Sequence, residues 1–564
     1  MQTAAYFFNL GVDNTKLIWY YMDTERSVDI LIKNWNVKID GRDMDHVEII
    51  DALMESRGIK NYDRFLNPVE KNMIPFEEMH GLEEGYKIVS ETIANNGKFI
   101  VHFDVDQDGC SSGAIMTRYL LNYTDKVSTV INEGKKHGVE DFDLNLLDDN
   151  TTLIVVDSLN NDPAVYRRIL STGAKLCVID HHLIEQRLLD ANLPFCLISS
   201  ANNYPNPALS GAGVVFKFCQ YIDSVEWNDY ADEYWDLATA GIIADMSDVS
   251  EQSPENRYIC YMGFNNQKNL AISKINGSFG FDAKAVSFGL APLVNAANRL
   301  NENEKTMRLF LSDDTKEVNA LIKDLKKCRE KQNDIVAEQM EELIAQGDKQ
   351  DSKKCMYFFI DVDADIAGLM GNKLLEKYQK PLFVLRKNDK EYTGSMRAVG
   401  VKNFAQIVND TGIGQCMGHE LAAGAFIPAD KFEEFQDKIE DVLKDVEFAQ
   451  TIDIDIQLDN EQVTDALIRQ IKDINKISGA GFPPITVMIG EVADYNIGDM
   501  SQGKHLKLTT PNVTFIKWNF SGWDDLWDLE GKEFYGVGQL DSGFFGRTYY
   551  RQLILNDFKF EDIW

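Results

Sequence analysis

The sequence predicts an α/β protein with two α/β lobes, a long helical connector between them and a small C-terminal β-barrel. Three observations support this class. Apolar strand-like runs alternate with helical segments from about 98 to 250, a long charged helical stretch occupies 313–346, and short strand-like runs dominate after 451. Such alternation is typical of a parallel sheet with crossover helices. A chain of 564 residues also exceeds what one hydrophobic core supports.

Five regions follow from this pattern. They are an ancillary N-terminal region at 1–80, a catalytic parallel-sheet lobe at 81–312, a connector at 313–354, a second α/β lobe at 355–450 and a β-barrel at 451–564. In the first lobe we predict strands at 99–103, 128–132, 153–157 and 175–180, and helices at 111–122, 162–171 and 212–223. In the second lobe we predict strands at 356–360, 381–386 and 392–397 and a helix at 365–378. In the barrel, residues 496–503 are predicted to form a turn.

Charge and composition narrow the classes of function. The net charge of −33 argues against a broad, non-specific coat for nucleic acid, although it leaves room for a local basic groove. No apolar run reaches the ~18 residues of a membrane span, and the N-terminus lacks a basic signal segment. The eight cysteines are scattered, without a Cys-x-x-Cys pair, as in reduced intracellular proteins. We therefore expect a soluble cytoplasmic protein without a membrane partner.

Short apolar runs lead into four groups of side chains that are hard metal ligands. These side chains are His102, Asp104, Asp106, Asp108, Asp157, His181, His182 and Asp245. Because the carboxyl ends of parallel strands meet at one edge of a sheet, we expect most of them to lie together. Asp245 follows a run that can be a strand or a helix, so it can instead end a helix.

These residue types indicate bound divalent metals. Mg²⁺ and Mn²⁺ prefer oxygen ligands, and Mn²⁺ also accepts imidazole. Two such ions about 3.5–4 Å apart can clamp a phosphoryl group. Asp157 is then a bridging candidate, and His181 closes one site with Asp245 opposite. His182 is left to bind or protonate phosphate. A single Asp at a strand end is usually a cap or turn residue, but four such groups in one α/β unit favour a metal site.

Two motifs carry a family resemblance. Asp-His-His at 180–182 and Asp-Val-Asp-Gln-Asp-Gly at 104–109 resemble the DHH phosphoesterase superfamily and, within it, the RecJ family of single-strand-specific exonucleases. The resemblance implies that Asp106 and Asp108 each favour one metal, with Asp157 between them. It also implies that His181 and Asp245 complete the second metal site.

The resemblance leaves one ligand open and gives His182 a role. Asp104 occupies a position that the RecJ family uses, whereas His102 matches a ligand of smaller superfamily members, so the two compete. His182 would touch the scissile phosphate. The residues expected to act directly in catalysis are His182, Asp157 and Asp108.

Further matches extend along the chain. Gly-Ser-Met-Arg at 394–397 and Gly-His at 418–419 resemble phosphate- and sugar-binding elements of a DHHA1 domain, with Met417 in place of a glycine. The segment 289–300 resembles a part of the RecJ family near the substrate, with Asn298 where glycine is usual. Residues 503–508 resemble the start of an OB-fold strand. The substrate-binding residues implied in this way are Asn295, Arg299, Ser395, Arg397, His419, Lys504 and Lys507.

Three functions are therefore open. The resemblance implies a two-metal exonuclease that degrades single-stranded DNA from the 5′ end and releases 5′-mononucleotides in DNA repair, recombination or replication. A DHH phosphodiesterase acting on short RNA or nucleotides is the second, and a RecJ-like scaffold for replication or repair partners is the third. The intact ligand set argues against a scaffold. We expect two Mn²⁺ or Mg²⁺ ions and single-stranded DNA as partner, and the acidic surface would also suit a basic or single-strand-binding protein.

Overall fold

The computed structural model describes residues 34–132, 137–277, 280–350, 352–446, 448, 451–520, 522–523, 526, 529, 531–545 and 548–562. The chain divides into two compact units. The parallel-sheet unit comprises Gly58–Glu330 and Asp473–Pro484, and the mixed-sheet unit comprises the chain up to Arg57, Lys331–Lys472 and Ile485–Trp564. One division falls inside the predicted N-terminal region and another inside the predicted connector. The five domain boundaries themselves stay predictions.

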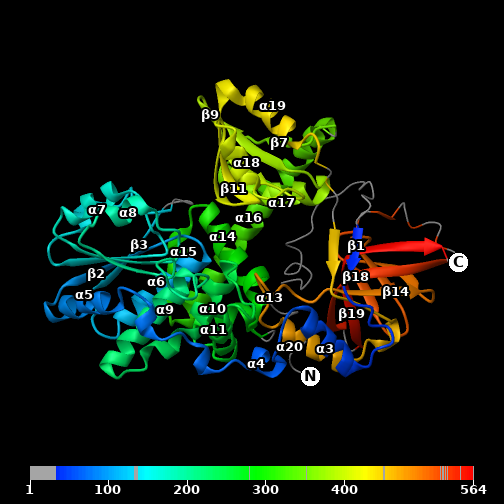
Figure 1. Ribbon diagram of the computed structural model, residues 1–564, viewed down its shortest axis with the longest axis horizontal. Coiled ribbons are helices and arrows are strands. Elements are labelled where there is room, and N and C mark those ends of the chain that lie inside the picture. The colour runs from blue at the N-terminus through cyan, green and yellow to red at the C-terminus, as the bar shows by residue number, and fades with distance from the viewer. Residues whose placement is uncertain are drawn as a thin grey trace. The chain divides into compact units, whose positions relative to one another are not determined.

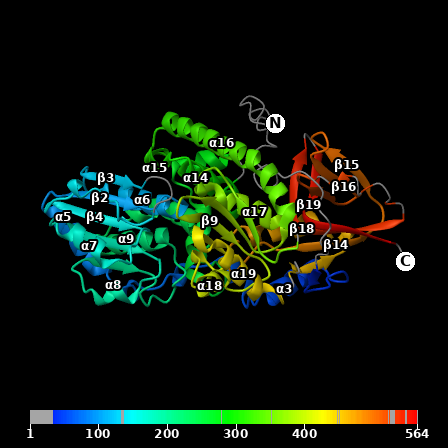
Figure 2. The ribbon, with the colours of Figure 1, turned by 90° about the horizontal axis from the view of Figure 1, so that it is seen from above.

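A five-stranded, wholly parallel sheet forms the centre of the parallel-sheet unit. Its strands in spatial order are β3 (Val127–Ile131), β2 (Lys98–Phe103), β4 (Thr151–Val156), β5 (Lys175–Asp180) and β6 (Cys196–Ser199). The four predicted strands are confirmed to within two residues, and β6 is an unpredicted strand at the edge. Figure 2 shows β2, β3 and β4 side by side. Strands β2, β4 and β5 are buried along almost their whole length, so they read as continuous apolar runs.

Helices cover both faces of this sheet. Figure 1 shows α7 (Pro163–Leu170) and α8 (Gln186–Asp190) on one face, and α5 (Leu82–Ala94), α6 (Gln107–Leu120) and α9 (Gly211–Glu226) on the other. The predicted helix at 111–122 begins earlier, at Gln107, because the Asp106 carboxylate caps it by accepting the Gly109 N–H at 3.0 Å. This earlier start places Asp108 in the first helical turn.

Helices follow the sheet in the rest of this unit. They include α10 (Trp235–Ala244), α11 (Pro254–Asn265), α12 (Leu270–Asn276), α14 (Ala291–Arg299) and α15 (Asn303–Leu311). Asp245 is the C-cap of α10, so it ends a helix rather than a strand. The predicted connector is one long helix, α16 (Thr315–Gly347), which is visible in Figure 2.

The second α/β sheet lies in the mixed-sheet unit. Its order is β10 (Gln415–His419), β11 (Ala422–Pro428), β9 (Glu391–Arg397), β8 (Leu382–Lys387) and β7 (Met356–Phe359). Helix α17 (Ala367–Tyr378) packs on one face, and α18 (Phe404–Asp410) and α19 (Phe432–Leu443) pack on the other. The predicted strands and the helix at 365–378 are confirmed, whereas β10, β11 and α18 were not predicted.

The C-terminal part of the mixed-sheet unit forms a seven-stranded sheet. Its order is β13 (Ile456–Leu458), β14 (Val487–Val492), β18 (Lys532–Phe545), β19 (Thr548–Asp562), β17 (Thr514–Lys517), β16 (His505–Thr509) and β15 (Asn496–Met500). Most neighbours are antiparallel, which is consistent with the OB-like domain expected here. The predicted turn at 496–503 is wrong in its first part, because residues 496–500 pair with β16 as an edge strand. Its turn begins only at 501.

The eight cysteines are all buried, and none forms a disulfide. Burial raises the pKa of Cys110 and Cys219 above the usual thiol value. The reduced state of the protein stays a prediction. Among the described residues, no helix combines the length and the apolar character needed to cross a bilayer.

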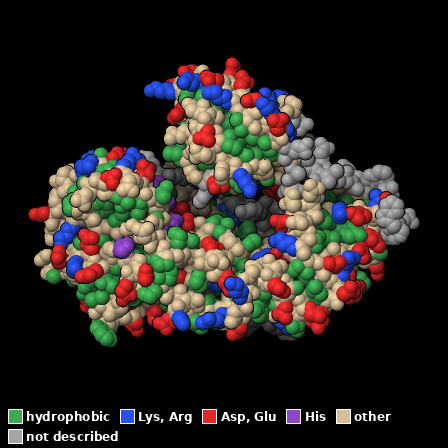
Figure 3. All heavy atoms as spheres, viewed as in Figure 1, with side chains coloured by type: hydrophobic (Ala, Val, Ile, Leu, Met, Phe, Trp, Pro, Cys, Tyr) green, Lys and Arg blue, Asp and Glu red, His purple; other side chains and the backbone are tan. Residues whose placement is uncertain are grey.

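The acidic charge is distributed rather than gathered in one place on the face drawn in Figure 3. There, Asp and Glu side chains are scattered among Lys and Arg. Many of these acids lie on solvated helix faces, such as Glu433 and Glu434 at the start of α19. Runs of charged residues on helices usually form such solvated faces.

A buried ion pair holds several parts of the parallel-sheet unit together. Lys217 Nζ lies 2.8 Å from Glu255 Oε1, and their side chains are 1% and 0% exposed. The Tyr204 hydroxyl and the Asn206 amide also donate to Glu255. The carbonyl of Ile74 accepts from Lys217. Every charged group in the network therefore has partners, as a buried charge requires.

Removing one member of this pair should destabilise the unit strongly. Glu255→Ala leaves an ammonium group buried without its counterion, and we expect a loss of about 3–5 kcal/mol, measured as a lower midpoint of thermal unfolding in calorimetry. The exposed pair Lys87–Glu83 provides the control, since Glu83→Ala should leave the unfolding midpoint at the wild-type value. Equal midpoints for the two variants would contradict a stabilising role of the buried ion pair.

Candidate metal centre

The carboxyl edge of the parallel sheet gathers seven of the eight predicted ligands. Asp104 follows β2, Asp106 and Asp108 start α6, Asp157 follows β4, His181 and His182 follow β5, and Asp245 caps α10. They form three sets whose ligand atoms lie within 4.8 Å of one another. The sets are Asp104, Asp106 and Asp157; Asp108, His181 and Asp245; and Asp157, His181 and His182. Asp157 and His181 each belong to two sets.

Asp157 is the central carboxylate of this cluster. It is buried, and its Oδ1 has no hydrogen-bond partner among the described residues, although His181 Nε2 lies 3.3 Å away. Its backbone has a φ of +51°, a conformation that a non-glycine residue adopts at a cost. Burial and the nearby Asp108 raise the pKa of Asp157 well above its usual value. A buried anionic oxygen without a donor is unfavourable, so this oxygen fits a cation ligand.

Asp108 is held by the start of helix α9. It accepts hydrogen bonds from Ser210 Oγ at 2.9 Å, Gly211 N at 2.7 Å and Ala212 N at 3.0 Å. The helix N-terminus favours the anionic form. Burial and Asp245 oppose it, and together they raise the pKa of Asp108 to about 7. Sequence reasoning missed this contribution of Ser210 and Gly211, because the segment carries no acidic or imidazole residue.

Two glycines make room for the carboxylates. A Cβ on Gly241 would come within 2.2 Å of Asp108 Oδ1, and a Cβ on Gly211 within 2.6 Å of Asp157 Oδ1. Any larger residue at either position must therefore displace a candidate ligand. Neither glycine was singled out from the sequence.

Asp104 and Asp106 complete the acidic side of the cluster. Asp106 is exposed at the surface, but the loss of hydration at its crowded carboxylate, with Asp104 and Asp108 nearby, raises its pKa to about 7. Asp104 Oδ1 accepts the Val105 N–H at 2.7 Å, and its Oδ2 lies 2.8 Å from His137 Nδ1. Sequence reasoning missed His137, because it stands in a loop with no strand-end motif around it.

Asp180 orients His182 and does not belong to any of the three ligand sets. It accepts hydrogen bonds from His181 N, His182 N and His182 Nδ1, each at 2.7 Å. Burial raises the pKa of Asp180, but its contacts with His182 outweigh burial, so the pKa lies well below the usual value. The burial of His182 lowers the pKa of its ring. The hydrogen bond and the charge of Asp180 outweigh this effect and raise the pKa of His182 to about 9. The half-exposed His182 ring is thus a fixed, cationic hydrogen-bond donor beside the cluster.

His102 lies apart from the three sets. It is fully buried, its Nε2 lies 3.3 Å from Asn132 Oδ1, and burial lowers its pKa to about 4. Asp104, by contrast, belongs to a set. The geometry favours Asp104 over His102 as a metal ligand, and the choice stays a prediction.

Asn295 and Arg299, the predicted substrate residues of this unit, are half-buried on helix α14. Between them, Asn298 is buried, and its Nδ2 donates to the carbonyl of Val105. This side chain, at a position where the family resemblance implies glycine, therefore contacts the loop that carries Asp104 and Asp106.

The other predicted substrate residues belong to the mixed-sheet unit. Ser395 and Arg397 alternate along β9, and Arg397 Nη1 donates to Ser395 Oγ at 2.5 Å. His419 ends β10, and its side chain lies outside the described part. Lys504 precedes β16, and Lys507 Nζ lies 4.8 Å from the centre of the Tyr550 ring. Their roles in substrate binding stay predictions.

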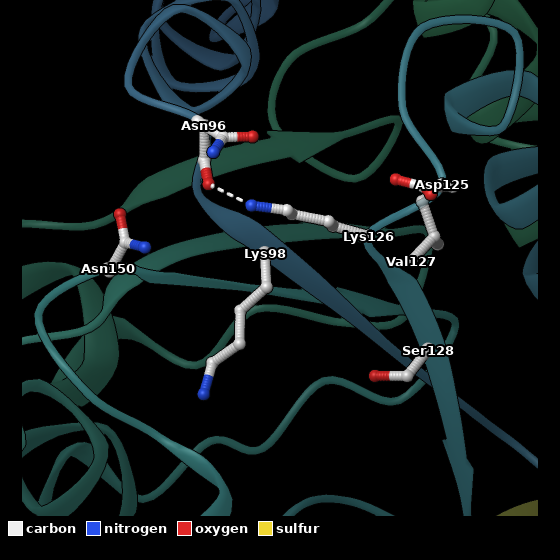
Figure 4. Close-up of a pocket in the computed structure, with 7 residues that line it drawn as sticks. All are labelled: Asn96, Lys98, Asp125, Lys126, Val127, Ser128 and Asn150. Carbon is white, nitrogen blue, oxygen red and sulfur yellow. Dashed lines mark hydrogen bonds between the residues drawn. The ribbon is translucent and has the colours of Figure 1, made fainter.

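A shallow hollow of about 450 Å³ lies at the amino ends of β2 and β3, opposite the metal cluster on the same sheet. Figure 4 shows Lys98 and Lys126 among the side chains that line it, with Lys126 Nζ bonded to the carbonyl of Asn96 at 3.0 Å. None of the predicted site residues lines it. The hollow therefore adds nothing to the predicted chemistry.

Comparison with known proteins agrees with this architecture. The model of the DHH family, N-terminal domain, matches residues 98–242, and that of the DHHA1 domain matches residues 352–445. The chain carries a DHH domain and a DHHA1 domain. The DHH match runs from β2 to α10 and contains every candidate ligand except Asp245, which follows three residues later.

Two curated relatives are named as single-strand DNA-specific exonucleases. The chain is 26% identical over 460 residues to YorK, a putative SPbeta prophage-derived single-strand DNA-specific exonuclease of Bacillus subtilis, covering 74% of this chain and 79% of YorK. It is 22% identical over 494 residues to the single-stranded-DNA-specific exonuclease RecJ of the same species, covering 82% and 61%. The crystal structure of RecJ from Thermus thermophilus in complex with Mn²⁺ matches with a TM-score of 0.75 at 21% identity, covering 93% of this chain and 79% of that one. This likeness shows the same fold.

Manganese binding to the DHH domain should depend on pH. A cation must displace protons from Asp106 and Asp108, whose pKa is raised to about 7. The affinity should therefore fall as the pH drops from 8 to 6, by about tenfold for each carboxylate, and binding should release protons. Calorimetry with Mn²⁺ in buffers of different ionisation enthalpy measures both. An affinity independent of pH would contradict the raised pKa values.

The two glycines offer a steric test of the DHH site. Gly241→Ala should weaken Mn²⁺ binding by about tenfold or more, because its Cβ has to move Asp108. Gly498→Ala, where a Cβ would meet nothing within 4 Å, is the matched control and should bind as wild type does. Calorimetric titration measures both affinities. Unchanged binding in Gly241→Ala would remove Asp108 from the ligand set.

Proposed function

We propose that the protein is a metal-dependent exonuclease that degrades single-stranded DNA from the 5′ end and releases 5′-mononucleotides. The observation that carries the proposal is the cluster of carboxylates and imidazoles at the carboxyl edge of the DHH domain, in which Asp108 and Asp157 are buried. The relatives named as single-strand DNA-specific exonucleases support it.

The chain offers ligands for two Mn²⁺ or Mg²⁺ ions. Asp104 and Asp106 would hold one ion, Asp108, His181 and Asp245 would hold the other, and Asp157 would lie between them. Two such ions supply an activated water molecule and neutralise charge on phosphate. Because the unsatisfied oxygen of Asp157 and the mixed oxygen and imidazole donors fit these cations, the site suits this role.

His182 has the geometry of a phosphate contact. Asp180 holds its Nδ1, so the exposed part of the ring is left to donate a hydrogen bond to an oxygen of the scissile phosphate. A pKa of about 9 keeps the imidazole protonated at neutral pH, which favours an anionic partner. Asp180 thereby positions the donor without touching the substrate.

The mixed-sheet unit would hold the strand. Ser395, Arg397 and His419 would bind phosphate and sugar, as in the DHHA1 elements they resemble. Lys504 and Lys507 would contact the backbone of the strand, and the ring of Tyr550 beside Lys507 is suited to stack with a base. Such an OB-like sheet favours a polymer over a small ester as substrate.

A second function has one observation in its favour. The net charge of −33 disfavours long-range attraction of a long polyanion. Short RNA or nucleotides carry fewer charges, so this net charge suits a DHH phosphodiesterase that acts on them. A basic or single-strand-binding protein partner and a cytoplasmic location stay predictions.

End-labelled substrates separate these functions. With Mn²⁺, the wild-type protein should release labelled mononucleotides at once from 5′-labelled single-stranded DNA, while 3′-labelled DNA shortens gradually. Asp157→Ala should reduce the rate by about 10³-fold or more, because it removes the ligand shared by both ions. Leu189→Ala, a solvated residue on α8, is the control and should act as wild type does. Cleavage of dinucleotides or short RNA alone would favour the second function, and no cleavage of any substrate would contradict both.

A further inference from the structure

Two exposed apolar residues directly follow residues of the metal cluster in the sequence. Leu183 directly follows His182 and is 79% exposed, and Met246 directly follows Asp245 and is 62% exposed. His181 Nδ1 and Asp245 Oδ2 lie 3.8 Å apart, so the segments that carry these two residues meet at the cluster. A single exposed apolar residue is ordinary on a protein surface. Two of them, each adjacent in sequence to a residue of the site, call for a separate explanation.

The backbone around Leu183 is fixed. Asp180 Oδ1 accepts the N–H groups of the two preceding residues. The Leu183 carbonyl accepts from Asn161 Nδ2 at 2.9 Å, and Asn161 Oδ1 accepts from Glu185 N at 2.8 Å. Leu183 is therefore held in place while its side chain reaches into solvent, and it contributes little apolar burial to the fold.

Met246 stands where the fold would favour glycine. Its φ is +58°, the left-handed conformation in which a Cβ is unfavourable. It directly follows the C-cap of helix α10. Its N–H donates to the Ile243 carbonyl at 3.3 Å, and Ser247 N donates to the Ile242 carbonyl at 3.1 Å. Glycine is the usual residue at such a helix end. Neither backbone strain nor burial therefore accounts for a long apolar side chain here.

Resting on the proposed function, we propose that Leu183 and Met246 form an apolar clamp that contacts the base of the terminal nucleotide. The phosphate of that nucleotide would lie at the metal cluster beside His182, one residue from Leu183. Every base has an apolar face, so contacts with a leucine and a methionine side chain hold a nucleotide without reading its sequence. Such contacts suit an enzyme that must accept each base in turn.

The clamp predicts a dependence on the base itself. Leu183→Ala and Met246→Gly should each raise KM about three- to tenfold on 5′-phosphorylated single-stranded DNA, since each removes apolar contact area. On the same DNA with an abasic 5′-terminal residue, neither variant should change KM. Met246→Gly should also unfold at the same or a higher temperature, because glycine suits its backbone.

Two controls separate the clamp from damage to the metal site. Leu189→Ala removes a leucine side chain that is 44% exposed on α8. It should leave KM unchanged on both substrates. Mn²⁺ affinity, measured by calorimetry, should be the same in Leu183→Ala, Met246→Gly and the wild-type protein. A changed Mn²⁺ affinity, an equal loss on both substrates or an unchanged KM on the normal substrate would overturn the clamp.

A binding measurement tests the clamp without turnover. In the presence of Mn²⁺, the wild-type protein should bind thymidine 5′-monophosphate more tightly than deoxyribose 5-phosphate, and Met246→Gly should lose that difference. Equal affinity of the wild-type protein for both ligands would overturn the clamp. Failure of the wild-type protein to cleave DNA, with the difference in binding intact, would contradict the proposed exonuclease function alone.

Discussion

The structure depends on the confinement of several carboxylates at one edge of a parallel sheet. Repulsion and loss of hydration oppose this arrangement. The chain offsets part of the cost with backbone donors, since the start of α9 serves Asp108 and the start of α6 serves Asp106. Asp157 receives no such donor among the described residues. The fold thus supplies enough support to hold the acids together and leaves a local excess of negative charge that divalent cations match.

Much of the fold could be predicted because its central strands are buried on both faces. Such strands read as uninterrupted apolar runs, so β2, β4 and β5 were found with their terminal acids and imidazoles. The elements that were missed have weaker patterns: β15, at a sheet edge, has only exposed and half-buried residues. Helix α6 begins before the predicted residue 111 because Asp106 caps it. Sequence reasoning treated Asp106 as a metal ligand and overlooked its role as a helix cap.

The candidate site was predicted where ligands follow strands and missed where contacts form only on folding. His137, Ser210, Gly211 and Gly241 come from loops or helices without an acidic motif, and nothing in their local sequence places them beside the ligands. The separate roles of Asp180 and His182 likewise follow from a hydrogen bond that only the folded loop creates. The preference for Asp104 over His102 as a ligand rests on two structural facts. His102 is buried away from the three ligand sets, and Asp104 belongs to one of them. Residue type and spacing predicted a metal site, but the role of each residue depends on tertiary contacts.

The burial of every thiol makes the cysteines natural reporters of local opening. The parallel-sheet unit contains Cys110, Cys177, Cys196, Cys219, Cys260 and Cys328, and the mixed-sheet unit contains Cys355 and Cys416. A thiol reagent can reach them only when the structure around them opens, so the rate at which each reacts records the free energy of that opening. The two units could therefore be followed separately in one unmodified chain, with and without metal, and the stabilisation that cations give to the acidic cluster could be read from the cysteines nearest to it.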